Sequence, residues 1–184
     1  IMIPTSHFLW FSIPPPAFAD MYVWLQKILG KGGDIVEFQN PLSSHINVGY
    51  FSDTLPENPE KILEKYDKKE IEISFTRVGM FGGIENPKVY FLSPDQTDIL
   101  STFQKWFFRI YPDLSNFLEN KLEYVPHMTI FRVNDQIRFL QKKDQVDRFL
   151  DDFLLGISKI LFPAKLTVFM VHSNFSPEIQ IPLL

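Results

Sequence analysis

Apolar and polar residues alternate along several short stretches of the chain, and this two-residue period is typical of half-buried β-strands. The stretch IEISFTRVGMF is followed by the turn sequence GGIENP and then by KVYFLS, so this region predicts a hairpin. We expect strands at residues 7–15, 43–51, 71–81, 88–93, 125–133, 164–173 and 178–184. A turn at NFSP, residues 174–177, separates the last two.

Three longer segments, residues 16–34, 93–114 and 135–160, instead repeat their apolar residues at the helical period, and each predicts a helix within it. The first begins near prolines and is expected to stop at the pair Gly32–Gly33. The second opens with Ser93 as a cap and Pro94 in its first turn, and ends before Pro112. The lysine-rich stretch 56–70 is expected to be a polar connection with one short helical part.

The order of these elements predicts an α+β protein. Neighbouring strands are joined by short turns, which favours antiparallel pairing. The chain has no glycine-rich phosphate loop and no tandem repeat. We therefore do not expect a nucleotide-binding site of the strand–loop–helix kind.

Composition narrows the class of protein. A chain of 184 residues, of which 45% are hydrophobic and 15% aromatic, can bury a sizeable core as one domain, and we expect a soluble globular protein. Cysteine is absent, which excludes a disulfide, a thiolate nucleophile and a thiolate metal site. The apolar opening lacks a basic segment, so we do not interpret it as a signal peptide, and no apolar run is long enough for a membrane span. A cytoplasmic location is the default expectation.

The formal net charge of −4 argues against a protein that binds long nucleic acids mainly through their phosphates. A small nucleotide or the end of a nucleic acid remains a compatible ligand.

Two histidine motifs lie far apart in the sequence. His45 is followed two residues later by Asn47, and His127 is followed two residues later by Thr129. Residues two apart in a strand point to the same face, so each motif presents an imidazole beside a short polar side chain. The residues between them, such as Ile46, are expected to face the core. If the two strands lie side by side, the four polar groups converge on one surface.

Paired imidazoles suit phosphate chemistry. A neutral histidine can take a proton from an attacking hydroxyl while a protonated one gives a proton to the leaving oxygen, because the imidazole pKa lies near neutrality. Asn47 and Thr129 would donate hydrogen bonds to the phosphoryl oxygens, where charge accumulates in the transition state.

The stretches HINVGYF and PHMTIFR resemble the paired H-x-[ST] motifs of the 2H phosphoesterase superfamily, which includes the RNA 2',3'-cyclic phosphodiesterases, also called the 2'-5' RNA ligase family. The second stretch matches closely, with Pro126 before the histidine and Arg132 five residues after it. The resemblance covers nearly the whole chain, and we interpret residues 1–184 as a single domain. It implies a bilobal α+β fold, in which two pseudo-symmetric antiparallel-sheet halves with outer helices surround a central cleft.

The resemblance also implies an activity: hydrolysis of a 2',3'-cyclic phosphate or a 2',5' linkage at a nucleotide or RNA terminus, without metal or cofactor, by a monomer. His45 and His127 would be the acid/base pair and Thr129 a phosphate anchor. Asn47 departs from the pattern, since Ser or Thr usually stands there; its amide can still donate, but it is longer than a hydroxyl.

Other polar residues are interpreted as structural. His7 does not share the motif. His172 stands two residues before Asn174, formally another H-x-N, but it lies at a strand end beside a turn. An ideal strand would point Arg132 away from His127, which favours an ion pair. Phe81, like Tyr50 and Phe131, is expected in the core or the wall of the cleft. Arg77, Lys88 and Tyr90 could contact a nucleotide, although exposed basic residues usually only face water. The pair Asp151–Asp152 lacks the converging ligands of a metal site, so no metal is expected.

Two alternatives to an enzyme stay open. The first is a nucleotide or RNA-end binding module, in which Asn47 marks a weakened catalytic site. The second is a purely structural or protein-interaction domain, which would have no affinity for nucleotides.

Overall fold

The computed structural model describes residues 5–172 and 180–182, and it contains two antiparallel sheets. The strands are β1 (Thr5–Ser12), β2 (Val36–Phe38), β3 (His45–Ser52), β4 (Glu70–Ile73), β5 (Phe75–Gly83), β6 (Asn86–Pro94), β7 (Met128–Val133), β8 (Phe162–His172) and β9 (Gln180–Pro182). The α-helices are α1 (Ala19–Leu29), α2 (Pro59–Glu64), α3 (Thr97–Ile110), α4 (Leu118–Lys121) and α5 (Gln136–Ile157). Short 3-10 helices lie at Pro15–Phe18, Pro41–Ser43 and Pro112–Asn116.

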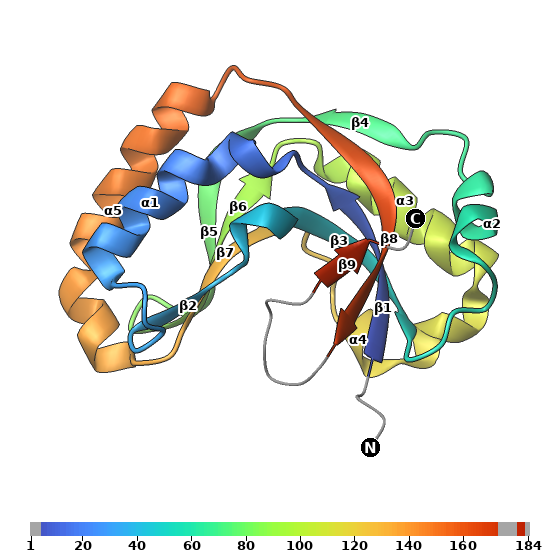
Figure 1. Cartoon of the computed structure of the whole chain (residues 1–184), viewed down its shortest axis with the longest axis horizontal. Helices are drawn as coiled ribbons and strands as arrows, with labels where there is room; N and C mark the ends of the chain where they lie inside the picture. The colour runs from blue at the N-terminus through green and yellow to red at the C-terminus, as the bar shows by residue number, and fades with distance from the viewer. Residues whose placement is uncertain (1–4, 173–179, 183–184) are drawn as a thin grey trace.

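Each sheet forms the centre of one lobe (Figure 1). Sheet A has the order β3-β1-β8-β4, with β9 paired to β8, and sheet B has the order β2-β7-β6-β5. The lobes form an arch, with helices α1 and α5 outside sheet B and helices α2 and α3 outside sheet A (Figure 1). The predicted α+β, bilobal, antiparallel fold with outer helices is therefore confirmed.

The chain crosses between the lobes repeatedly. It leaves sheet A after β1, builds α1 and β2 in the other lobe, and returns to sheet A with β3. Helix α3 follows β6 of sheet B but packs against β3 of sheet A. These crossings bind the two halves, because neither sheet is formed by one continuous segment of chain.

Helices α1 and α5 cover sheet B through single apolar stripes. In α1 the buried residues are Met21, Tyr22, Leu25 and Leu29, and in α5 they are Phe139, Val146, Leu150, Leu154 and Ile157. Most neighbouring members of each set are three, four or seven residues apart, the spacings of one helix face. Helix α5 is continuous, so the middle of the predicted segment 135–160 does not interrupt it.

The predicted strand at 71–81 is wrong in one respect, because it is two strands in different sheets. Residues up to Ile73 pair with β8 in sheet A, and residues from Phe75 pair with β6 in sheet B. The break falls at Ser74, whose backbone N–H donates to the side chain of Gln96 at 2.9 Å. Alternation continues through the break, so the residue pattern alone does not reveal the change of sheet.

Two helix ends also differ from the prediction. Ser93 and Pro94 belong to β6, where Pro94 pairs with Phe75, and α3 begins after Gln96 without a side-chain cap. The side chain of Gln96 instead forms two hydrogen bonds with Ser74. Helix α1 ends at Gly30, before the pair Gly32–Gly33, because Gly30 adopts a φ of 83°, which glycine tolerates best.

Strand β2 was not predicted, since three residues carry too little alternation to recognise. Strand β8 and the paired part of β9 confirm the last two predicted strands. The turn predicted at residues 174–177 lies outside the described residues. Within residues 5–172 and 180–182, no helix combines the length and apolar character needed to cross a bilayer.

Gly49 sets how closely α3 approaches sheet A. A Cβ at this position would lie 2.5 Å from the ring of Phe107, which is fully buried. We expect Gly49→Ala to lower the free energy of unfolding by about 1–3 kcal/mol, because a buried ring must move. Urea denaturation measures this change.

Gly156→Ala is the matched control, because Gly156 lies inside α5 and a Cβ there would meet nothing within 4 Å. This variant should be more stable than the parent by about 0.5–1 kcal/mol. Equal stability of Gly49→Ala and the parent would contradict the close packing of α3 on β3.

Candidate active site

His45 is the first residue of β3, and its ring is fixed by the backbone just before the strand. The Nδ1 atom lies 2.6 Å from the carbonyl oxygen of Ser43. Because a carbonyl oxygen can only accept, Nδ1 carries the proton of this hydrogen bond. The neutral ring then has its free electron pair on Nε2, which is the atom available to accept a proton.

His127 repeats this local arrangement. Its Nδ1 lies 2.6 Å from the carbonyl oxygen of Val125, again two residues earlier, so its Nε2 is also free for proton exchange. His127 itself precedes strand β7 rather than lying in it, which differs from the prediction. Pro126 explains the difference, because proline has no N–H for a strand ladder. Ile46 and Met128 are fully buried, as the alternation predicted.

The two histidines approach from different sheets. Strands β3 and β7 are not neighbours in one sheet, contrary to the simplest expectation, but they lie against each other where sheet A meets sheet B. Strand β2 pairs with β7, and the Gln39 N–H extends this pairing by donating to Ile130 at 2.8 Å. A short link then leads to Ser44, whose carbonyl accepts from the N–H of Ile13, just after strand β1 of sheet A, at 2.9 Å.

A second connection joins the segment before His127 to the free edge of β3. The side-chain amide of Asn120 accepts from the N–H of Tyr50 at 3.0 Å and donates to its carbonyl at 2.8 Å. The hydroxyl of Tyr124 donates to the carbonyl of Asn47 at 2.8 Å. These contacts occupy backbone groups of an edge strand and hold His127 near His45.

Burial and positive neighbours disfavour protonation of both rings. Burial lowers the pKa of His45 from 6.5 to about 4; the hydrogen bond to Ser43 opposes this change, and the charges of His127 and Arg132 add to it. Burial also lowers the pKa of His127, with Arg132 adding to the effect and the Val125 hydrogen bond opposing it. Because Arg132 acts on both rings and His127 acts on His45, the three groups lie in one electrostatic neighbourhood.

The aromatic surroundings of the two rings differ. The indole of Trp10 lies flat against His45, with ring centres 3.5 Å apart and an angle of 8° between the planes. His127 meets Phe81 edge-on at 5.0 Å and Phe91 at a tilt at 5.1 Å. Phe81 is thus part of the wall of the site, as expected.

A β-bulge brings Arg132 to the site. Strand β7 pairs Phe131 with Tyr90 and then Thr129 with Phe91, so Ile130 has no direct partner on β6. The extra residue reverses the alternation, and Arg132 comes to the same side as Thr129, where both line one small cavity. The expectation that Arg132 points away from His127 is therefore wrong, because it assumed an unbroken strand.

That small cavity has a volume of about 30 Å³ and is lined by Glu37, Phe38, Gln39, Thr129 and Arg132. The Nε2 atom of Gln39 is buried and has no hydrogen-bond partner among the described residues. Such a cavity holds one or two oxygen-sized atoms. Three donor side chains, those of Gln39, Thr129 and Arg132, therefore meet around a space for a small acceptor. Sequence reasoning missed Gln39, since nothing in its local pattern distinguishes it.

Asn47 lies elsewhere in the site. It lines a larger cavity of about 420 Å³ together with His127, Phe81, Gln104 and Tyr124, between the two sheets. Its Oδ1 atom is buried without a partner among the described residues. Among the cavities lined by described residues alone, one is shared by Asn47 and His127 and another by Thr129 and Arg132.

The remaining residues that the sequence singled out lie as follows. His7 is buried in β1 with its Nδ1 3.2 Å from the Ser52 carbonyl, and His172 is the last residue of β8. The hydroxyl of Tyr90 donates to Asp147 at 3.0 Å in the lobe of sheet B. Arg77 and Lys88 are exposed.

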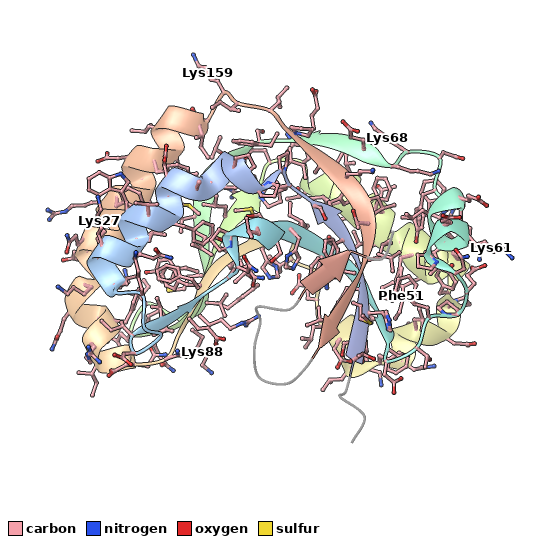
Figure 2. The ribbon with its side chains drawn as sticks, in the orientation of Figure 1. Lys27, Phe51, Lys61, Lys68, Lys88 and Lys159 are labelled. Atoms are coloured by element: carbon pink, nitrogen blue, oxygen red, sulfur yellow. The ribbon has the colours of Figure 1, made fainter. Side chains whose placement is uncertain are left out.

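No three His, Asp or Glu side chains gather in a possible metal site within residues 5–172 and 180–182. Lys27, Lys61, Lys68 and Lys159 lie on the outer side of the arch (Figure 2). The positive charge of Arg132 contributes to the lowered pKa of both histidines.

Three solved structures resemble the chain over almost its whole length. TT0787 of Thermus thermophilus is 13% identical, with a TM-score of 0.57, and the match covers 97% of this chain and 95% of TT0787. LigT of E. coli, solved in complex with 3'-AMP, is 12% identical with a TM-score of 0.58, covering 98% and 96%. Usb1 of Kluyveromyces marxianus is 11% identical with a TM-score of 0.50, covering 98% of both chains.

All three are 2H phosphoesterase-family proteins, and this chain has the fold of that family, as its two motifs predicted. Neither models of protein families nor curated protein sequences gave a match to the chain. At 11–13% identity the likeness concerns the fold, and the roles of individual residues depend on the geometry described above.

The lowered pKa of His45 makes stability depend on pH. Between pH 6.5 and about 4 the unfolded chain binds a proton at His45 that the folded protein does not bind, so the free energy of unfolding decreases as the pH falls through this range. The expected loss is on the order of 3 kcal/mol. In His45→Gln this part of the loss should be absent, which urea denaturation at several pH values can measure. Parallel curves for the parent and His45→Gln would show that His45 is not buried in its neutral form.

Proposed function

We propose that the protein is a phosphodiesterase that hydrolyses a 2',3'-cyclic phosphate or a 2',5' linkage at the end of an RNA or a nucleotide, with the two histidines as acid and base. The proposal rests on one observation: the imidazole rings of His45 and His127 are held in the same way. In both, Nδ1 is held by a carbonyl two residues earlier, which leaves Nε2 for proton transfer. Because the pair supplies both a proton acceptor and a proton donor, the mechanism needs no metal ion.

In this reaction one neutral histidine takes a proton from water as the water oxygen attacks phosphorus. The other, protonated, histidine gives its proton to the ribose oxygen as the bond from that oxygen to phosphorus breaks. The product is a phosphomonoester and a free hydroxyl. The negative charge of the bound phosphate favours the protonated state of the second ring, and so opposes the lowering of its pKa by burial.

The cavity lined by Gln39, Thr129 and Arg132 would receive the non-bridging oxygens of the phosphate. Its size suits oxygen atoms, and one of its donors, Nε2 of Gln39, is buried without a partner among the described residues. Glu37 lines the same cavity and limits its affinity for anions through repulsion. Asn47, in the cavity beside His127, would contact the nucleoside side of the substrate instead.

A terminal substrate suits the charge of the molecule better than a long nucleic acid does. The net charge is −4, and four of the lysines, Lys27, Lys61, Lys68 and Lys159, lie on the outer side of the arch (Figure 2). In LigT the same fold was solved with 3'-AMP, so in that protein it accommodates a mononucleotide.

The second candidate is a binding module for nucleotides or RNA ends without turnover. The observation that favours it is the first motif itself, which has Asn47 in place of Ser or Thr; the Asn47 Oδ1 atom is buried without a partner among the described residues, and its amide is longer than a hydroxyl. A binding module would show saturable affinity for the cyclic phosphate but no ring opening.

The direct test is an oligonucleotide that ends in a 2',3'-cyclic phosphate, incubated with the protein in a chelator and analysed by mass. We expect the mass to increase by one water molecule. His45→Ala and His127→Ala should each lower the rate at least about a hundredfold, because each removes a proton-transfer group. Asn47→Thr should retain or raise the rate.

His7→Gln is the matched control, because His7 is a structural histidine in β1 and should leave turnover unchanged. A full rate in His45→Ala would show that the pair of histidines is not the acid and base. Binding without any ring opening at high protein concentration would favour the binding module.

The phosphate cavity has a separate test. Gln39→Leu and Arg132→Lys should each lower kcat/KM about tenfold or more, because one loses a buried donor and the other loses the planar fork of the guanidinium. Glu37→Gln, on the same cavity, should raise kcat/KM by removing a repulsive charge. If all three variants matched the parent within about twofold, the phosphate would bind elsewhere.

A further inference from the structure

One face of the His45 ring is covered by a stack of aromatic side chains. Trp10 lies against His45 at 3.5 Å and 8°, and Phe169 lies against Trp10 at 4.4 Å and 25°. Trp10 is only 3% exposed and Phe169 is 7% exposed. We call these three residues the His45 stack.

The register of sheet A creates this stack. Ser12 is directly opposite His45 on β3, so Trp10, two residues earlier in β1, is the diagonal neighbour of His45. On the other side of β1, Phe8 is directly opposite Phe169, which makes Phe169 the diagonal neighbour of Trp10. Diagonal neighbours on adjacent strands lie within reach of large aromatic side chains. Three strands therefore contribute one ring each.

His127 has no comparable cover among the described aromatic residues. Phe81 presents its edge at 89°, and Phe91 is tilted by 56°. The same local fixation at Nδ1 is thus combined with two different surroundings. The two histidines therefore have different environments, although their sequence motifs are alike.

Two effects of an indole on an imidazole act in opposite directions. Contact with the indole face attracts an imidazolium, which changes the protonation equilibrium about twofold to fivefold at an exposed site. Removal of water from the ring disfavours the charged form by about a thousandfold or more when burial is complete. The charged groups that act on His45 are His127 and Arg132, and both are positive or become so. Dehydration and like charge therefore outweigh the attraction.

We propose that Trp10 is a positioning residue that acts through His45. By lying flat on the imidazole, Trp10 keeps water from that face, holds the ring in the orientation bonded to Ser43, and keeps the ring uncharged. His45 is then the proton acceptor and His127 the proton donor. The division of roles rests on the proposed function. The control of His45 by Trp10 does not, because it is a property of the free protein.

The test follows the ring protons of His45 by NMR as the pH is varied, in the parent, in Trp10→Phe and in Trp10→Leu. In the parent the Hε1 resonance of His45 should be displaced upfield by the indole ring current and should titrate with a midpoint near 4, the pKa given by its surroundings. Trp10→Phe keeps a ring against His45 and should keep a low midpoint. Trp10→Leu should raise the midpoint by more than about one pH unit, while the midpoint of His127 should move less.

Assignment uses His45→Gln, which removes one resonance, and Trp24→Phe is the control, because Trp24 lies on α1 with 52% of its surface exposed. If Trp10→Leu fails to fold, Trp10→Met replaces it, since methionine fills irregular space without a ring. A His45 midpoint that stays unchanged in a folded variant without a ring at position 10 would overturn the proposal.

Kinetics then separate this inference from the function. On the cyclic phosphate substrate, the acid limb of the kcat/KM profile should move upward in Trp10→Leu by the same amount as the His45 midpoint. If the parent shows no turnover while the NMR midpoint still moves, the proposed function fails and the control of His45 by Trp10 stands. An acid limb that stays in place while the midpoint moves would refute His45 as the proton acceptor.

Discussion

The join between β3 and β7 is the contact on which the rest of the site depends. These strands belong to different sheets, and hydrogen bonds hold them together from both sides of the site. On one side the pairing of β2 with β7 continues through the N–H of Gln39 to Ile130. On the other, Asn120 and Tyr124 occupy backbone groups at the edge of β3. Because the two imidazoles come from different lobes, these bonds bring them to one site.

This contact between the strands has an electrostatic cost. It brings two imidazoles and the guanidinium of Arg132 into one partly dehydrated space, and the pKa of both histidines decreases as a result. The free protein therefore favours two neutral rings, whereas acid/base catalysis needs one neutral and one charged. Under the proposed function, an anionic substrate would correct this imbalance, because its charge favours one imidazolium. The same reasoning favours a phosphate over a neutral ligand.

Much of the fold could be predicted from the sequence, because alternation and helical spacing act over short distances. The strands containing His45 and Thr129, the long helix that ends before Pro112, and the fold of the 2H phosphoesterases all followed from local patterns and two motifs. Two of the errors share one cause. A change of sheet at Ser74 and a bulge at Ile130 both preserve plausible local alternation while changing which strand, or which face, a side chain meets.

The sequence by itself determined which residue types were available for chemistry: two histidines with polar neighbours two residues later, and no cysteine. Only the tertiary structure decided their surroundings. It brought Arg132 to the side of Thr129 through a bulge, placed Gln39 beside both, and laid Trp10 flat on His45 through the register of three strands. The physical reason is that a side chain's identity is local, whereas its hydration, its neighbours' charges and its pairing depend on segments that are distant in the chain.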